Sequence, residues 1–324
     1  MNKVIVSGSS GYIGAHLVHQ LLERGYLVTG IDKYPFPQDG HLKNFHELII
    51  DLECESSWLS FESELVSQTS DHTAIFHLAS SSDMSASFSD PEKYIEMELL
   101  KAKRLTSLLT ESDVKKVFVF SSSCSVYGNT LDEPAKENSP LHPISPYANA
   151  KAQVEEFLMD QAKTQNYSSI SFRFFNVVGR DHAKGLAETH SPETHILPQL
   201  LRATKENSTF TVFGTDFETA DGSALRDYID VRDVARGLIL GLEKRLTFGN
   251  ENLLIWNLGS EKPLTVLELI QKVEAVTGTR IQKKFSGRRL GDPAKAVADS
   301  SKVHRDLNWY PEYSIEDSIL SLLV

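Results

Sequence analysis

Runs of β-branched and aromatic residues alternate with amphipathic stretches through the first half of the chain. Apolar runs at 3–7, 27–32, 74–79 and 116–122 predict strands, and the periodicity at 11–24 predicts a helix between the first two. The runs are continuously apolar, which is typical of strands buried on both faces. This alternation predicts an α/β fold with a parallel sheet covered by helices on both sides.

The pattern continues past the middle of the chain and then changes. The residues at 147–164 predict a long helix, and those at 170–177 predict another buried strand. The following segment, 181–193, is rich in His, Thr and charged residues and predicts a loop. We therefore expect the chain to enter a second, smaller lobe after Gly179.

Apolar periodicity resumes at Ile196, and 227–246 again predicts a strand followed by a helix. This second strand-helix signal suggests that the chain returns to the first domain before it ends. We expect one domain over 1–177, rejoined by about 227–257, and a smaller α/β substrate-binding lobe over 178–324.

The composition is that of a folded protein of enzyme size. Hydrophobic residues make up 40% of the 324 positions and charged residues 24%, far from the signature of disorder. Neither Cys54 nor Cys124 has a His or Cys at metal-ligand spacing, so we expect no disulfide and no metal site. No apolar stretch approaches the ~20 residues of a membrane span, and no charged leader precedes one, so we expect a cytoplasmic protein.

The net charge of −11 limits the choice of partners. The average field of such a protein repels nucleic acid and acidic membranes, so we expect neither as a partner. A phosphate-bearing ligand would require basic side chains gathered at its site.

Three glycines mark a candidate cofactor site. Gly8, Gly11 and Gly14 follow the first predicted strand at intervals of three residues and open the first helix. In this context glycines allow a tight turn through which helix amides hold a pyrophosphate, so the pattern predicts a Rossmann-type, doubly wound sheet. Asp32 ends the next strand, where a carboxylate accepts ribose hydroxyls and repels a 2′-phosphate. We expect NAD rather than NADP, although the adjacent Lys33 is a signal in the other direction.

A serine-rich strand end and a tyrosine-lysine pair form a candidate catalytic site. Ser121–Ser123 end the fourth predicted strand, and Tyr147 and Lys151 stand four residues apart in the long helix. That spacing places both side chains on one helix face, where the ammonium favours phenolate. A free tyrosine titrates near pH ~10, so a base at neutral pH needs this help. We expect Tyr147 and Lys151 to be catalytic, with Ser123 nearest the substrate hydroxyl.

Longer motifs carry a resemblance over nearly the whole chain. They are FVFSSS at 118–123 with VYG at 126–128, RFFNVVG at 173–179, DGSALRDYIDV at 221–231 and RRLGDP at 288–293. With these motifs, the glycine turn and the Ser-Tyr-Lys set, the sequence resembles the UDP-glucose 4-epimerase family of extended short-chain dehydrogenases/reductases. The last two motifs are typical of sugar-nucleotide enzymes.

The resemblance implies roles for individual positions and a homodimer. NAD would be held by Gly8, Gly11, Tyr12, Ile13, Gly14, Asp32, Asp51, Leu52, Leu78, Ala79, Ser80, Tyr147, Lys151 and Phe175. The UDP-sugar would be held by Ser123, Asn176, His195, Ile196, Leu197, Thr211, Val212, Phe213, Arg226, Arg289 and Asp292. The two arginines would supply the positive charge that the pyrophosphate requires.

The implied activity is epimerisation of a UDP-hexose at C4 through a transient 4-keto sugar. Tyr147 would take the proton of the 4-hydroxyl, and UDP-glucose and UDP-galactose would be the substrates, with N-acetylated forms as further candidates. Related dehydratases and decarboxylases carry a carboxylate just after the catalytic Ser or Thr, whereas Cys124 and Ser125 follow Ser123 here. We therefore favour an epimerase and expect Cys124 to be a small buried residue.

Several positions depart from the family pattern. A lysine expected after His77 is missing from 80–83, and 97–102 replaces an Asn-rich motif that ends in Gly-Thr. These changes predict altered NAD affinity or turnover. His195 stands where galactose-type enzymes have Asn, and the small Ala296 predicts tolerance of UDP-N-acetylglucosamine.

Two alternatives remain open from the sequence. A nucleotide-sugar reductase or dehydrogenase would use the same fold but change the amount of NADH in solution. A catalytically impaired NAD-binding sensor would bind the cofactor without turnover, but retention of Ser123, Tyr147 and Lys151 argues against it.

Overall fold

The described part of the chain forms two compact units, each assembled from separate segments. The computed structural model describes residues 3–38, 42–69, 72–80, 84–109, 116–129, 134–164, 167–186, 195–247 and 253–323. Unit 1 comprises Met1–Ser123, Ser145–Arg173 and Ala235–Trp256, and unit 2 comprises Cys124–Ile144, Phe174–Val234 and Asn257–Val324. Each unit has its own hydrophobic core.

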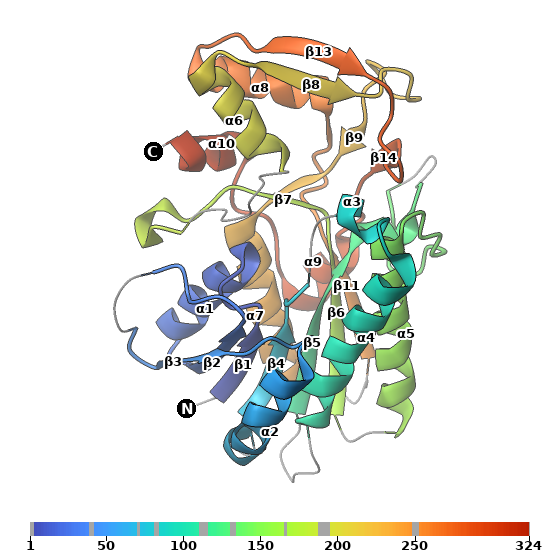
Figure 1. Ribbon diagram of the computed structural model, residues 1–324. Coiled ribbons are helices and arrows are strands. Elements are labelled where there is room, and N and C mark those ends of the chain that lie inside the picture. Colours follow the sequence, from blue (N-terminus) through green and yellow to red (C-terminus); the bar gives the residue numbers. More distant parts are fainter. Residues whose placement is uncertain are drawn as a thin grey trace. The chain divides into compact units, whose positions relative to one another are not determined.

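Unit 1 is built on a seven-stranded sheet with the order β11-β6-β5-β4-β1-β2-β3 (Figure 1). The pairs that join β3 through β2, β1 and β4 to β5 are parallel. The strand order reverses between β1 and β4, which is where a doubly wound sheet binds its ligand. The predicted α/β fold with a Rossmann-type sheet is therefore confirmed. The strands are β1 Lys3–Ser7, β2 Leu27–Asp32, β3 Phe45–Ile49, β4 His72–His77, β5 Lys116–Ser123, β6 Tyr167–Phe174 and β11 Leu253–Leu258.

Helices cover both faces of this sheet (Figure 1). Side chains of α2, α4 and α5 share one core with the sheet, including Trp58, Leu105 and Leu158. On the other face lie α1 and α7 (Figure 1). The helices are α1 Tyr12–Glu23, α2 Glu55–Thr69, α3 Met84–Ser87, α4 Pro91–Ser107, α5 Pro146–Thr164 and α7 Val231–Thr247.

Local sequence explains where the two helices nearest the candidate site begin. At α4 the Asp90 carboxylate accepts a hydrogen bond from the Lys93 N–H, and Pro91 occupies the first turn. At α5 the Ser145 hydroxyl accepts from the Ala148 N–H, and Pro146 is the first helical residue. Each cap satisfies a helix N–H that would otherwise lack a partner. The starting points of both helices are thus fixed.

The strand predicted over 170–177 is in fact two strands, so this prediction was wrong in part. β6 ends at Phe174, and a separate β7 runs over Asn176–Val178 and pairs with β10, Tyr228–Asp230. At the break the Phe175 N–H bonds to the Leu258 carbonyl, and the next N–H bonds to the Asp227 carbonyl. The chain changes sheets here, which an apolar run cannot reveal. The strand predicted over 74–79 ends at His77, and β3 and α2 were not predicted.

Unit 2 combines short sheets with amphipathic helices. Its core joins α6, β8, α8 and α10 through side chains such as Leu200, Val212 and Ile270. A capping box between Thr265 and Glu268 begins α8. The remaining elements are η1 Cys124–Tyr127, η2 His182–Lys184, α6 Ile196–Glu206, β8 Thr209–Phe213, β9 Leu225–Arg226, β12 Leu264–Thr265, α8 Val266–Thr277, β13 Gln282–Ser286, β14 Lys295–Ala296, α9 Ser301–Leu307 and α10 Ile315–Leu323.

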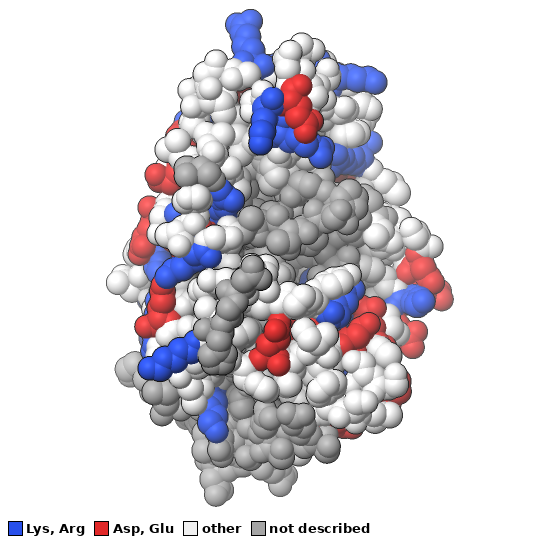
Figure 2. Space-filling view, turned by 60° about the vertical axis from the view of Figure 1, so that its left-hand side comes forward, with Lys and Arg blue, Asp and Glu red and all other residues white. Residues whose placement is uncertain are grey.

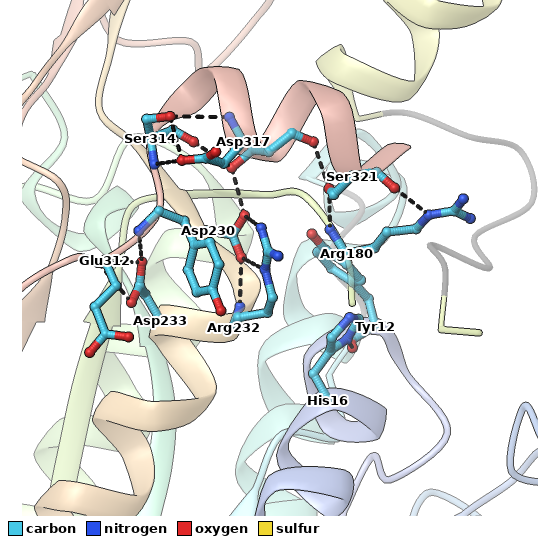
Figure 3. Close-up of polar contacts among 12 residues, drawn as sticks. Tyr12, His16, Arg180, Asp230, Arg232, Asp233, Glu312, Ser314, Asp317 and Ser321 are labelled. Carbon is cyan, nitrogen blue, oxygen red and sulfur yellow. Dashed lines mark hydrogen bonds and ion pairs between the residues drawn. The ribbon is translucent and has the colours of Figure 1, made fainter. Parts of the chain in front are cut away.

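Buried carboxylates attach the C-terminal segment to the rest of unit 2 (Figure 3). Asp230 forms an ion pair with both Nε and Nη2 of Arg232, at 2.8 and 2.9 Å, and accepts a hydrogen bond from the Ser318 hydroxyl at 2.6 Å. Asp233 accepts from the Glu312 N–H at 3.0 Å. The Arg232 ion pair and these hydrogen bonds offset the cost of burying the two carboxylates.

Candidate active site

The glycine turn between β1 and α1 has room for backbone but not for side chains. Gly8 adopts a φ of +75°, and a Cβ there would lie 2.6 Å from the Ala79 nitrogen. A Cβ on Gly14 would lie 1.9 Å from the Gly8 carbonyl oxygen. Both positions therefore require glycine. The resulting tight turn lets backbone approach the N-terminus of α1 closely, where the helix dipole favours a pyrophosphate, so it fits a dinucleotide.

Asp32 lies beside this turn at the end of β2. One carboxylate oxygen accepts from the Ser10 N–H at 3.0 Å, and the other accepts from the Tyr34 N–H at 3.1 Å. Each oxygen keeps a lone pair for a further donor, such as a ribose hydroxyl. The Lys33 ammonium lies 5.3 Å from the centre of the Tyr34 ring, whose side chain is exposed. The geometry fits the adenosine ribose of NAD.

Other residues expected around NAD lie at or just beyond neighbouring strand ends. Ser7 of β1 pairs with both Ile31 and His77, so Gly8, Asp32 and Leu78, the next residue along each strand direction, lie at one level. Of the rest, Ala79 and Ser80 follow Leu78, Asp51 and Leu52 follow β3, and Phe175 belongs to unit 2. Ser81–Asp83 lie outside the described residues.

The expected catalytic residues all come from unit 1. Ser123 is the last residue of β5, and Tyr147 and Lys151 lie in the first turns of α5. The Lys151 Nζ is 5.8 Å from the centre of the Tyr147 ring and 4.9 Å from that of Phe120. The Tyr147 N–H donates to the Ser87 hydroxyl at 3.2 Å. The structure thus brings the phenol and the ammonium together on one helix face, as the spacing predicted.

A buried network that the sequence did not predict holds β5 against α5. The Ser122 hydroxyl donates to Glu155 at 2.5 Å. The same carboxylate binds Nε and Nη2 of Arg173 at 2.9 and 2.6 Å. All three side chains are buried. Arg173, the first residue of the RFFNVVG motif, therefore supports the packing of β5 against α5 through Glu155.

A second unpredicted group surrounds Lys151. The Lys151 ammonium lies 3.6 Å from a carboxylate oxygen of Glu98 on α4, and the other oxygen of Glu98 forms an ion pair with Lys101. The Ser80 hydroxyl donates to Glu98 at 2.7 Å, and Lys101 also contacts Glu53 at 3.1 Å. One sequence signal for this group was that 97–102 departs from the family motif. A spacing of three residues on a helix could have suggested the contact between Glu98 and Lys101.

Burial and charge act in opposite directions on these groups. Burial lowers the pKa of Lys151, a shift that Glu98 opposes and Lys101 reinforces. Burial disfavours the charged form of Glu98, but Lys151 and Lys101 hold the pKa of this carboxyl below its usual value. The nearby His77 is fully buried, and burial together with Lys151 lowers its pKa to about 3.

In unit 2, residues expected to bind the UDP moiety lie around β8, β9 and the 289–293 segment. Arg226 forms an ion pair with Asp292 and donates to the Pro293 carbonyl at 2.7 Å. The guanidinium carbon of Arg289 lies 3.9 Å from the centre of the Phe213 ring. These contacts connect β9 and β8 to the 289–293 segment.

The other expected sugar-nucleotide contacts occupy neighbouring elements of unit 2. His195 is the N-cap residue of α6, and Ile196 and Leu197 begin that helix, with Leu197 fully buried in the core. Thr211 and Val212 lie in β8, where Val212 is also buried, and Asn176 begins β7. Full burial of Leu197 and Val212 leaves mainly their backbone for ligand contacts. Ala296 pairs with Arg226 across β14 and β9.

Within the DGSALRDYIDV motif, part of the pattern serves the fold. Asp227 is buried and accepts hydrogen bonds from the N–H and hydroxyl of Ser260 and from the N–H of Ala298. Burial raises the pKa of Asp227 despite these donors. Asp230 is likewise buried and paired, as Figure 3 shows. Cys124 is partly exposed, so the expectation of a buried residue was wrong.

The surface carries charges of both signs, with Lys and Arg gathered at the upper end of the face in Figure 2. This end corresponds in height to β8 and β13 in Figure 1, and β13 contains Lys283 and Lys284. Within the described ranges, no helix has the length and apolar character to cross a membrane. Local basic residues thus occur in a chain whose net charge is −11.

A Rossmann-type sheet with a glycine turn, a carboxylate after β2 and a Ser-Tyr-Lys set defines the extended short-chain dehydrogenase/reductase class. A model of the NAD dependent epimerase/dehydratase family matches residues 4–259. The chain is 32% identical to a UDP-glucose 4-epimerase from Lactobacillus helveticus, over 98% of this chain and 95% of the relative. The chain therefore belongs to the NAD dependent epimerase/dehydratase family.

Solved structures of similar proteins agree with this membership. The UDP-glucose 4-epimerase from Stenotrophomonas maltophila, with bound NAD and formylated UDP-arabinopyranose, has a TM-score of 0.87 and 28% identity, covering 99% of this chain and 96% of that one. The enzyme from Bifidobacterium longum, in complex with NAD+ and UDP, has a TM-score of 0.87 and 27% identity, covering 99% and 97%. The similarity thus extends over both units.

Proposed function

We propose that this protein is an NAD-dependent UDP-hexose 4-epimerase that interconverts UDP-glucose and UDP-galactose. The observation that carries the proposal is the placement of Tyr147 and Lys151 on one face of α5, at the end of the sheet where β5 finishes with Ser123. The full-length similarity to UDP-glucose 4-epimerases supports the choice of reaction. We propose the individual NAD and UDP-sugar contacts by the same reasoning.

In this proposal the residues of unit 1 perform the proton transfer. Tyr147 takes the proton of the sugar 4-hydroxyl, Lys151 stabilises the phenolate, and Ser123 hydrogen-bonds the same hydroxyl. Bound NAD would supply a reversible hydride acceptor for C4. The network of Ser122, Glu155 and Arg173 holds the strand end and the helix in register.

Residues of unit 2 would hold the nucleotide. Arg226 and Arg289 provide guanidinium groups that can bind pyrophosphate oxygens, and Asp292 orients Arg226. Epimerisation requires that the nucleotide is held firmly while the sugar presents either face. Ala296, opposite Arg226 in the sheet, leaves a small side chain at this position, which supports UDP-N-acetylglucosamine as an additional substrate.

The test is to incubate the purified protein separately with UDP-glucose and UDP-N-acetylglucosamine, without added reductant, and to separate the products by anion-exchange chromatography. We expect the galacto epimer, with no net change in NADH absorbance. Stoichiometric NADH formation would instead establish a dehydrogenase. Absence of conversion by protein that contains NAD would support a sensor.

We also propose that the protein is a cytoplasmic homodimer, as the family resemblance implies. Light scattering on purified protein should then give twice the chain mass of 36.2 kDa. A mass equal to one chain over the working concentration range would reject the dimer.

A further inference from the structure

Glu98 brings a full negative charge into direct contact with the proposed catalytic lysine. One of its oxygens faces Lys151 at 3.6 Å and accepts the Ser80 hydroxyl at 2.7 Å. Its other oxygen pairs with Lys101, one helical turn further along α4. The Glu98 side chain is only 2% exposed and the two lysine side chains 3% and 6%. The carboxylate thus bridges two buried ammonium groups.

The three charges depend on one another. An isolated ion in a protein interior is costly, so each of these groups needs the others to stay charged. Their sum is +1, since two lysines carry +2 and Glu98 carries −1. A single buried lysine would give the same net charge beside Tyr147. Lys101 therefore cancels the effect that Glu98 would otherwise have on the phenol.

We propose that Glu98 and Lys101 are positioning residues: Glu98 holds the Lys151 ammonium in place beside Tyr147, and Lys101 offsets the negative charge of Glu98. This rests on the proposed function only in that Tyr147 is taken as the catalytic base. Among the residues that the structure describes, the titratable groups that face Lys151 are Glu98 and Lys101 from α4, His77 from β4, and Tyr147 and Glu155 from α5. Glu53, which contacts Lys101, is about half exposed.

Two single variants should shift the titration in opposite directions. Glu98→Gln removes a negative charge, which favours both phenolate and neutral amine, so both limbs of the kcat/KM pH profile should move down by about one pH unit. Lys101→Met removes a positive charge and should move both limbs up by a similar amount. The double variant restores the net charge of +1, and its limbs should return close to those of the unmodified protein.

Exposed residues of the same helix provide matched controls. Glu96→Gln and Lys103→Met remove the same charges from solvent-exposed positions on α4. Their charges are screened by water, so both limbs should stay within about 0.2 pH unit. Thermal unfolding of every variant shows whether it is folded. If Glu98→Gln does not fold, Lys101→Met and the double variant still test the proposal.

A measurement without substrate separates this inference from the proposed activity. The ultraviolet absorbance of tyrosinate is titrated in each variant, and the same titration with Tyr147→Phe added is subtracted, which isolates Tyr147. The midpoint should move down in Glu98→Gln, up in Lys101→Met, and back in the double variant. If stability or turnover falls while every midpoint stays fixed, Glu98 has only a structural role and the proposal fails. If the midpoints move but no UDP-hexose is converted, the proposed function fails and this inference stands.

Discussion

In the proposed site, Tyr147 is the base and Lys151 is the buried ammonium beside it. The phenol needs a nearby cation to act as a base at neutral pH, and the ammonium at the required position is almost fully buried. Burial lowers the pKa of Lys151, which would weaken this effect if Glu98 did not oppose it. In the proposed mechanism, the cation beside Tyr147 therefore depends on a carboxylate outside the Ser-Tyr-Lys set.

The Tyr147→Phe variant tests the catalytic assignment. Loss of the hydroxyl removes the proton acceptor and leaves the ring, so turnover should fall by about a thousandfold while UDP affinity changes little. Initial rates and calorimetric titration with UDP measure the two effects. Tyr94→Phe is the control, because it removes a hydroxyl from a ring whose centre lies 6.5 Å from that of the Tyr147 ring. It should lower turnover by less than about threefold. Equal losses in the two variants would refute the assignment.

His77 should make stability depend on pH. Its folded-state pKa of about 3 lies below the usual 6.5, so below pH 6.5 the unfolded chain takes up a proton that the folded protein does not. The free energy of unfolding should therefore fall by up to about 1.4 kcal/mol per pH unit as the pH decreases. Urea unfolding between pH 6.5 and about 5 measures the slope. His77→Gln should reduce it; an unchanged slope would show that other groups are responsible.

At the scale of elements, the β1-α1 turn depends on packing between backbones. A methyl group at Gly14 would collide with the Gly8 carbonyl, whereas at Gly25, which follows the end of α1, nothing lies within 4 Å. Gly14→Ala should destabilise the protein by about 3 kcal/mol and reduce the NAD content of the purified protein. Gly25→Ala should cost only about 1 kcal/mol, for its φ of +79°. Chemical unfolding measures the stability of both variants, and release of bound NAD measures their cofactor content. Full NAD content in Gly14→Ala would contradict the proposed site.

Two adjacent arginines of unit 2 permit a matched comparison. Arg289 stacks on Phe213 at 3.9 Å, and Arg288 stacks on Phe217 at 4.4 Å and pairs with Asp216. Of these two neighbours, Arg289 is proposed to bind the pyrophosphate and Arg288 is not. Arg289→Ala should weaken UDP binding by about 10- to 100-fold, the effect of losing a charged hydrogen bond. Arg288→Ala should change it by less than about threefold, and the reverse order in calorimetry would reassign the role.

The whole molecule should be stabilised by its nucleotide. A ligand that binds only the folded state at a hundred times its Kd adds about 2.7 kcal/mol, which corresponds to several degrees in Tm for a protein of this size. UDP should therefore raise Tm, and uridine, which lacks the pyrophosphate, should not. Differential scanning fluorimetry measures the shift. Equal shifts would show that the phosphates are not recognised by the arginines of unit 2.

The sequence determined the elements whose signals are local. Continuous apolar runs identified four strands of the sheet, the glycine spacing located the β1-α1 turn, and the spacing of Tyr147 and Lys151 fixed their shared helix face. The family, the Rossmann-type sheet and the dependence on NAD are confirmed. The assignments of individual site residues and the domain boundaries stay predictions. The predictions of strands, turn and helix face succeed because residues close together in the sequence suffice to specify them.

Only the tertiary structure revealed contacts between distant positions. The run at 170–177 gives no sign that Phe175 leaves one sheet, because the choice is made by the Leu258 carbonyl. Likewise Arg173 pairs with Glu155, and Lys151 meets Glu98, fifty-three positions earlier. Charges on separate elements interact strongly only when packing removes water between them. The sequence therefore pointed to the proposed reacting groups, but packing decided which charges surround them.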